Sequence, residues 1–153
     1  MNIINPNYSG SHLRIGIVQA RFTNAIGSEM VKACHKRLIK LGVAEADITL
    51  ATVPGALEVP LILKQMAQSQ QFDALVAIGV VIRGETYHFE LVSNEAAAGV
   101  SRIALDYNIP IANAILTTED DPQAIARMYI KGSEAAAVAV EMANLLKTQY
   151  AHV

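Results

Sequence analysis

The chain has 153 residues, a length that fits one ordinary domain and is short for two. Twelve basic and fourteen acidic residues leave a formal net charge of −2 without a run of like charges, which argues against a nucleic-acid-binding protein. A single cysteine, Cys34, excludes an intrachain disulfide and a cysteine-based metal cluster. We expect residues 1–153 to form one domain, with residues 1–11 as a flexible or interface segment.

Membrane insertion and secretion are also disfavoured by the sequence. The apolar stretches fall well short of the ~20 residues that cross a bilayer, and the N-terminal residues lack the charged-then-apolar order of a secretory signal. We therefore expect a cytoplasmic protein that contacts neither a membrane nor a nucleic acid.

Hydrophobic patterning predicts strands and helices in alternation. The expected strands cover residues 13–18, 48–53, 74–82 and 110–116. The expected helices cover residues 26–41, 60–68, 89–107, 121–132 and 133–150. Gly42 ends the first helix and Lys131-Gly132 ends the fourth, because glycine readily adopts the left-handed conformation that follows a helix.

This alternation predicts a parallel sheet, because each helix must carry the chain back to start the next strand by a right-handed crossover. The fold class is α/β: a three-layer α/β/α sandwich with a four-stranded parallel sheet, flavodoxin-like. Ligands of such sheets bind outside the carboxyl ends of the strands. The four loops that follow Ala20, Val53, Ile82 and Leu116 should therefore carry the site.

The first two loops offer an aromatic ring and a carboxylate. Phe22 can stack on a flat heterocycle, or it can simply cover the edge of the sheet. Pro54-Gly55 forms a tight turn that lets the backbone approach a ligand closely. Glu58 follows at a helix N-terminus, where it can accept hydrogen bonds from a polyol or act only as a helix cap.

The third loop, residues 80–90, combines the end of a buried strand, a glycine turn, a hydroxyl group and an imidazole at the start of a helix. Free amides near Glu85 and Thr86 would favour an anion such as a phosphate. His88 can take or give a proton near neutral pH, although a capping or surface histidine is the alternative. The fourth loop is acidic, but Arg127 and Lys131 on the following helix could hold an anion or remain solvated.

Five segments in this order resemble the lumazine synthase family of riboflavin biosynthesis, from the first strand to the last helix. They cover residues 20–22, 53–60, 79–90, 116–119 and 131–136. The resemblance implies a cofactor-free, metal-free transferase that condenses 5-amino-6-(D-ribitylamino)uracil with 3,4-dihydroxy-2-butanone 4-phosphate. The implied products are 6,7-dimethyl-8-ribityllumazine, phosphate and water, in the penultimate step of the pathway.

The resemblance also implies a role for each matching residue. His88 would transfer protons, and the butanone phosphate would be held by Glu85, Thr86, Arg127 and Lys131, with Arg127 reaching over from a neighbouring subunit. The residues implied for the pyrimidine substrate stack on its ring, hold its ribityl chain or bind its edge: Phe22, Ala56, Leu57, Glu58, Val80, Val81, Ile82 and Asn113. Two positions depart from the family pattern: Thr23 replaces a common Asn, and Asn113 replaces a frequent Phe and could hydrogen-bond to the pyrimidine.

Assembly is expected as well. The family forms pentamers, which in some members close into an icosahedral shell, so the resemblance implies at least a homopentamer, with riboflavin synthase as a further protein partner. Pro6 and Gly10 disfavour strand pairing by the N-terminal segment, so we expect a pentamer or a pair of pentamers rather than a shell.

Two rival functions are less well supported. A non-catalytic flavin- or lumazine-binding protein would need Phe22 and Glu58 but neither His88 nor the phosphate-binding residues. A flavodoxin-like signalling or electron-transfer module would need an acidic cluster or a phosphate loop after the first strand, and the residues that follow Ala20 form neither.

Overall fold

A computed structural model describes residues 1–149, and within them four parallel strands form one sheet in the order β2-β1-β3-β4. The strands are β1 (Ile15–Ala20), β2 (Ile48–Val53), β3 (Ala74–Ile82) and β4 (Ile111–Thr118). The helices are α1 (Asn24–Leu41), α2 (Val59–Gln68), α3 (His88–Tyr107) and α4 (Asp121–Gln149), with short 3₁₀ turns at Glu45–Asp47 and Ala56–Glu58.

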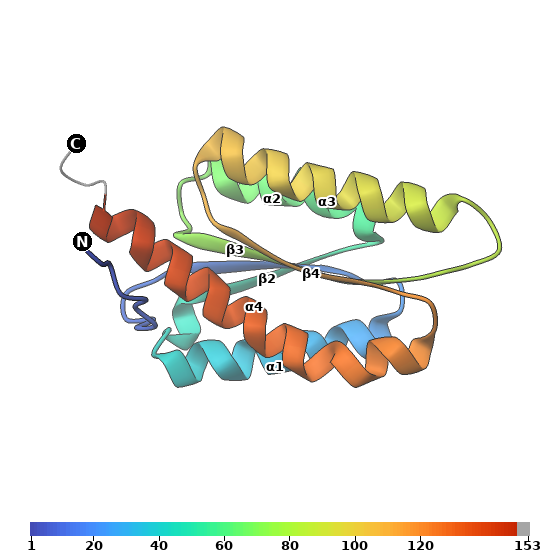
Figure 1. Ribbon diagram of the computed structural model, residues 1–153, viewed down its shortest axis with the longest axis horizontal. Coiled ribbons are helices and arrows are strands. Elements are labelled where there is room, and N and C mark those ends of the chain that lie inside the picture. The colour runs from blue at the N-terminus through green and yellow to red at the C-terminus, as the bar shows by residue number, and fades with distance from the viewer. Residues whose placement is uncertain (150–153) are drawn as a thin grey trace.

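The helices cover both faces of the sheet, with α1 and α4 on one side and α2 and α3 on the other (Figure 1). The predicted α/β/α architecture with a four-stranded parallel sheet is confirmed. The first and last strands begin and end one to two residues later than predicted, because apolar periodicity marks a strand more sharply than it marks the strand's ends.

The core has two main layers, one on each face of the sheet. All six residues of β1 are buried, and β3 is buried from Ala74 to Val80. This is why β3 is almost continuously apolar instead of alternating, since both of its faces pack against helices. Ala135, Ala136 and Ala139 are also buried, on the side of α4 that faces the sheet.

The predicted helix end at Lys131-Gly132 is wrong, because α4 continues through it as one helix. Gly132 is buried, and a Cβ atom there would lie 2.4 Å from the carbonyl oxygen of Met30 and 3.1 Å from the Cβ of Ala33. The glycine therefore lets α4 approach α1 closely and does not cap a helix. The other predicted end, near Tyr150, lies outside the described residues.

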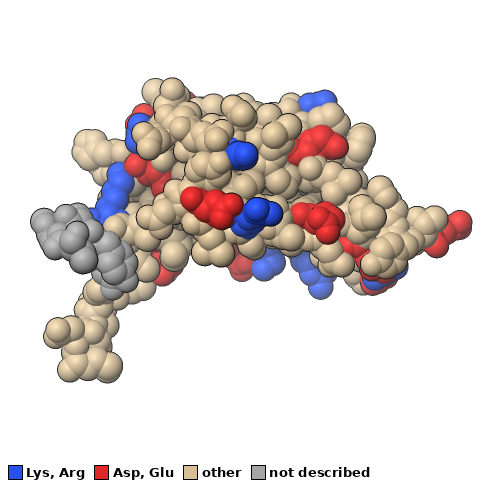
Figure 2. Space-filling view, turned by 90° about the horizontal axis from the view of Figure 1, so that it is seen from above, with Lys and Arg blue, Asp and Glu red and all other residues tan. Residues whose placement is uncertain are grey.

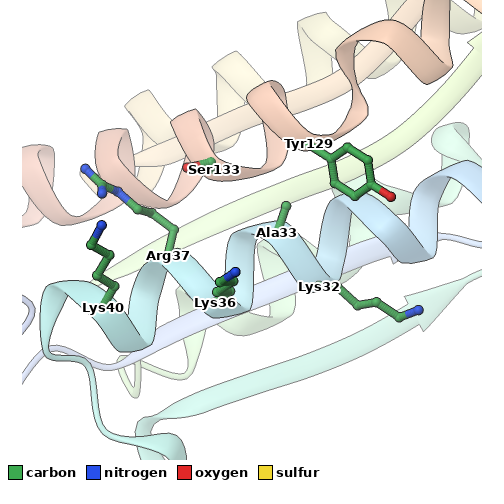
Figure 3. A pocket seen from close by; sticks show the side chains of 7 residues that line it. All are labelled: Lys32, Ala33, Lys36, Arg37, Lys40, Tyr129 and Ser133. Atoms are coloured by element: carbon green, nitrogen blue, oxygen red, sulfur yellow. The ribbon is translucent and has the colours of Figure 1, made fainter.

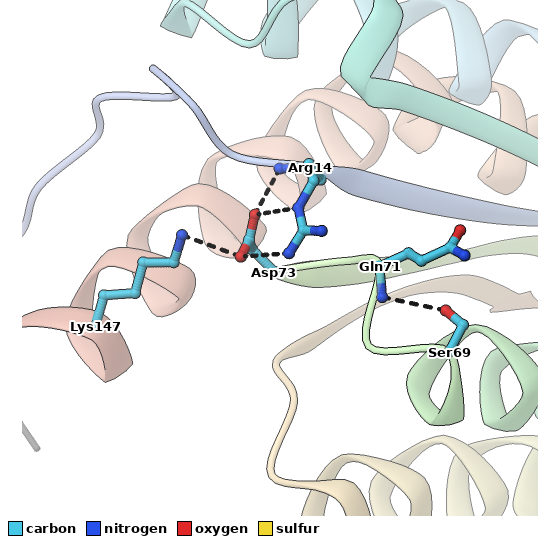
Figure 4. A network of polar contacts seen from close by, with 5 residues as sticks. All are labelled: Arg14, Ser69, Gln71, Asp73 and Lys147. Carbon is cyan, nitrogen blue, oxygen red and sulfur yellow. Dashed lines mark hydrogen bonds and ion pairs between the residues drawn. The ribbon is translucent and has the colours of Figure 1, made fainter. Parts of the chain in front are cut away.

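The amino end of β3 is tied to the last turns of α4 by Asp73, whose side chain is only 9% exposed (Figure 4). One oxygen accepts from the backbone N–H of Arg14 at 2.7 Å, and the other pairs with Lys147 Nζ at 3.0 Å. Burial raises the pKa of the Asp73 carboxyl, but the hydrogen bonds from Arg14 and Lys147 outweigh it and leave the pKa below its usual value. In the neighbouring turn, the N–H of Gln71 donates to Ser69 Oγ at 3.2 Å.

The N-terminal segment is bound to the same end of the domain. Asn144 donates to the carbonyl oxygens of Asn7 and Ser9, both at 2.9 Å, and the N–H of Gly10 donates to Leu41 at 2.7 Å. Across the described residues, no helix is both long enough and apolar enough to cross a membrane.

Candidate active site

A cavity of about 420 Å³ and another of about 410 Å³ lie on opposite faces of the sheet. The first is a groove between α1 and α4, lined by basic side chains from α1, including Arg37 and Lys40, and by Tyr129 of α4 (Figure 3). It contains none of the predicted site residues. The second lies at the carboxyl ends of β1 and β3, where parallel sheets bind ligands. We therefore take the second cavity as the candidate site.

This cavity brings together eight of the predicted site residues from three different loops. They are Phe22, Ala56, Leu57, Glu58, Val80, Val81, Ile82 and His88. The lining also includes Thr23, Gly55 and Val92. Glu85 and Thr86 are exposed in the loop just before His88 and do not line the cavity in this chain.

Backbone hydrogen bonds fix the loop that carries Phe22, and its side chain remains exposed. Its N–H donates to the carbonyl of Pro54 at 2.9 Å, and the N–H of Arg21 donates to Val53 at 2.8 Å, which continues the pairing of β1 with β2. The ring lies directly over Gly55, where a Cβ atom would be only 2.7 Å from it. Gly55 thus leaves room for the ring. Phe22 as a whole is 67% exposed, so its ring is accessible for stacking.

Thr23 has a left-handed backbone, with φ at 61° and ψ at 41°. This conformation is unfavourable for a β-branched residue and much easier for Asn or Gly. The carbonyl of Thr23 nevertheless accepts from the N–H groups of Ile26 and Gly27, so the strained residue begins α1. The strain therefore lies between the aromatic ring of the site and the first helix.

Glu58 turns its carboxylate back toward its own loop. Its Oε2 accepts from the N–H of Gly55 at 2.9 Å, so the capping contact that the sequence suggested is present. The same side chain lines the cavity. Because an ionised carboxylate has acceptor sites for several hydrogen bonds, the cap leaves capacity for a hydroxyl-bearing ligand.

The end of β3 exposes backbone groups to the cavity. β1 pairs with β3 only as far as Gln19 opposite Ile78, whereas β3 continues to Ile82 along β4. The backbone groups of Val80–Ile82 on the side that faces β1 therefore have no paired residue of β1 opposite them. Backbone N–H and C=O groups without a strand partner can read the hydrogen-bonding edge of a flat ring.

His88 is the first residue of α3, and its N–H donates to Thr86 Oγ1 at 3.3 Å. His88 lines the cavity and is itself exposed. The hydrogen bond between His88 and Thr86 joins the expected proton-transfer residue to the expected phosphate-binding loop.

Asn113, Arg127 and Lys131 lie elsewhere in the same chain. They line a separate hollow of about 320 Å³ along β4, which is an edge strand of the sheet. Arg127 donates to the carbonyl of Gln123 at 2.9 Å, and Lys131 pairs with Glu134 at 3.0 Å. One chain therefore does not bring these residues to the Phe22 cavity.

Arg83 is a site-loop residue for which the sequence analysis gave no role. Its side chain contacts Glu90, Glu119 and the ring of Phe89. The sequence holds no signal for the pair with Glu119, because the two residues meet only when β3 and β4 pair in this register.

Comparisons with known proteins show the family of this chain. A sequence model of the family described as 6,7-dimethyl-8-ribityllumazine synthase matches residues 12–147. The chain is 71% identical over 146 residues to the 6,7-dimethyl-8-ribityllumazine synthase of Neisseria meningitidis serogroup C, covering 95% of this chain and 92% of the relative. It is 66% identical over 145 residues to the protein of the same name from Chromobacterium violaceum, covering 95% and 94%. The chain therefore belongs to the 6,7-dimethyl-8-ribityllumazine synthase family of enzymes.

Proposed function

We propose that this protein condenses 5-amino-6-(D-ribitylamino)uracil with 3,4-dihydroxy-2-butanone 4-phosphate, giving 6,7-dimethyl-8-ribityllumazine, phosphate and water in riboflavin biosynthesis. Membership of the family supports this reaction. The observation that carries it is the gathering of Phe22, Glu58, the end of β3 and His88 around one cavity.

The pyrimidine substrate fits the cavity by its shape and its polar groups. The ring of the uracil stacks on Phe22, and its edge meets the backbone of Val80–Ile82. The ribityl chain lies along Ala56 and Leu57, with hydroxyl groups donating to Glu58.

The butanone phosphate occupies the side of the cavity nearest the loop before α3. Its phosphate binds the amides and hydroxyl group of Glu85 and Thr86 at the amino end of that helix. Arg127, helped by Lys131, pairs with the same phosphate from a neighbouring subunit, and Asn113 of that subunit hydrogen-bonds to the pyrimidine.

The reaction then proceeds without a cofactor. The 5-amino group attacks the ketone and water leaves, phosphate is eliminated, and the ribitylamino nitrogen closes the ring with loss of a second water. His88 moves protons during these steps, which contributes roughly 10²–10⁴-fold. Holding the two substrates face to face can supply several kcal/mol more, about 7–11 in favourable cases.

A homopentamer is part of this proposal, because each subunit carries two partial sites. The surface formed by α2 and α3 supports association: Leu61, Leu91 and Leu105 are exposed there by 64%, 43% and 84%. Figure 2 shows acidic and basic side chains together along the middle of this face, between uncharged areas. Large apolar side chains left exposed on one face favour contact with another protein. Riboflavin synthase, which would use the product, is the further partner that we propose.

The test is to mix the protein with both substrates and follow lumazine fluorescence together with phosphate release. We expect both products at equal rates. If neither rises above the uncatalysed background while the protein remains folded, the proposed function is wrong.

A further inference from the structure

Arg83 connects the third and fourth strand-end loops. It directly follows β3, and its backbone N–H donates to the carbonyl of Thr118 at 2.9 Å. Its guanidinium Nε donates to Glu119 Oε2 at 2.7 Å, and a second nitrogen donates to Glu90. The guanidinium also stacks over the Phe89 ring, 4.3 Å from the centroid. One side chain thus joins the end of β3, the first turn of α3 and the loop after β4.

The contact between Arg83 and Glu90 closes the loop that carries the expected phosphate-binding and proton-transfer residues. Residues 83–88 are all exposed, and a Cβ atom added at Gly84 would meet nothing within 4 Å in the described chain. Inside this loop, the hydrogen bond from the His88 N–H to Thr86 is a long one at 3.3 Å. The conformation of the loop therefore depends strongly on how its two ends are held.

The surrounding charges make Arg83 a poor phosphate ligand. Its single positive charge faces two carboxylates, Glu90 and Glu119. The hydrogen bond from Arg83 holds the pKa of Glu90 below its usual value, so this carboxyl is ionised at neutral pH. An approaching phosphate would have to compete with both carboxylates for the same guanidinium.

We propose that Arg83 is a positioning residue for the condensation. It holds the loop so that Glu85 and Thr86 receive the butanone phosphate and His88 points into the cavity, without itself touching either substrate. The planar guanidinium suits this task because it can hold two carboxylates in fixed directions while lying flat on a ring. This inference rests on the proposed function.

Three variants distinguish positioning from direct binding: Arg83→Met, Glu90→Gln and the double variant. For a positioning role, each should raise KM for the butanone phosphate by about tenfold. The double variant should be no worse than Arg83→Met alone, because that change already removes the contact with Glu90. If Arg83 bound the phosphate directly, Glu90→Gln would free its charge and lower that KM. A lower KM in Glu90→Gln would therefore overturn the proposal.

Arg83→Lys should raise KM for the butanone phosphate less than Arg83→Met does. An ammonium group can pair with one carboxylate but lacks the planar fork of the guanidinium. KM for the pyrimidine substrate should stay within about twofold in all these variants, because Phe22 and Glu58 belong to other loops. The matched control is Lys32→Met, which removes a basic residue paired with Glu29 on the exposed surface of α1, away from both the Phe22 cavity and the proposed subunit interface. It should leave both KM values unchanged.

Amide hydrogen exchange gives a readout that does not depend on activity. In Arg83→Met, the hydrogen-bonded amides of His88 and Leu91 should exchange about tenfold faster than in the unaltered protein, while α2 and β1 should be unaffected. Unchanged exchange in this loop would overturn the proposal even if lumazine forms. Faster exchange in a protein that makes no lumazine would preserve the structural role of Arg83 and count against the proposed function alone.

Discussion

The close contact between α1 and α4 makes Gly132→Ala the most informative single substitution for the fold. The new methyl group would lie 2.4 Å from the carbonyl oxygen of Met30, where ordinary contacts are 3.4–4 Å. The obstacle is backbone and cannot rotate away, so the helices must separate by about 1 Å over a close-packed layer. Replacing Gly132 therefore tests whether this approach stabilises the domain.

The expected loss follows from two opposing contributions. Overpacking of this kind lowers the free energy of unfolding by up to ~3 kcal/mol. Replacing glycine by alanine inside a helix raises it by ~1 kcal/mol. We expect the free energy of unfolding to fall by ~2 kcal/mol, which lowers Tm by roughly 4–8 °C for a domain of this size.

The assay is urea unfolding followed by circular dichroism at a fixed protomer concentration, since association changes apparent stability. The midpoint should fall without a change in slope. Gly84→Ala is the control, because its methyl group meets nothing within 4 Å, and stability should change by less than ~0.5 kcal/mol. A Gly132→Ala protein as stable as the original would refute the argument that close approach requires this glycine.

Four further substitutions test the site and the fold. Thr23→Asn should raise the free energy of unfolding by ~1 kcal/mol in urea titrations, because Asn tolerates the left-handed backbone at φ 61°. A lower free energy of unfolding would contradict the argument that Thr23 is strained. Asp73→Asn should lower the free energy of unfolding by ~1–2 kcal/mol at pH 7. Because folding lowers the pKa of Asp73, the stability difference from the unaltered protein should shrink as pH falls below about 4. A stability difference that does not depend on pH would exclude the ion pairs as its cause. His88→Ala should lower kcat by roughly 10²-fold without abolishing it, since substrate positioning remains, and complete loss in a folded assembly would show that the imidazole does more than move protons. Arg127→Ala should raise KM for the butanone phosphate by about tenfold and leave the pyrimidine KM unchanged, whereas equal changes in both would argue against its role on the phosphate.

Local sequence patterns predict the four strands, the first three helices and the edge of the sheet where the candidate site lies. Apolar periodicity is a local property, and it marks β3 and the buried stripe of α1 directly. Gly42 was correctly predicted to end α1, because its left-handed φ of 101° and its hydrogen bonds to Ile39 and Leu38 involve only neighbouring residues. Once parallel strands are given, the carboxyl ends must share one edge, so the loops of Phe22, Glu58 and His88 had to meet.

Features that depend on contacts between distant segments cannot be predicted from local patterns. Gly132 carries the same local signal as Gly42, but its role depends on Met30 in another helix. Phe22 packs against Gly55, and Arg83 contacts Glu119. Each contact joins two segments that no local sequence pattern connects. The fold of one chain also separates Arg127 and Lys131 from the Phe22 cavity. Side-chain periodicity fixes which face of an element is buried, whereas the distance between two faces is set by how the elements pack.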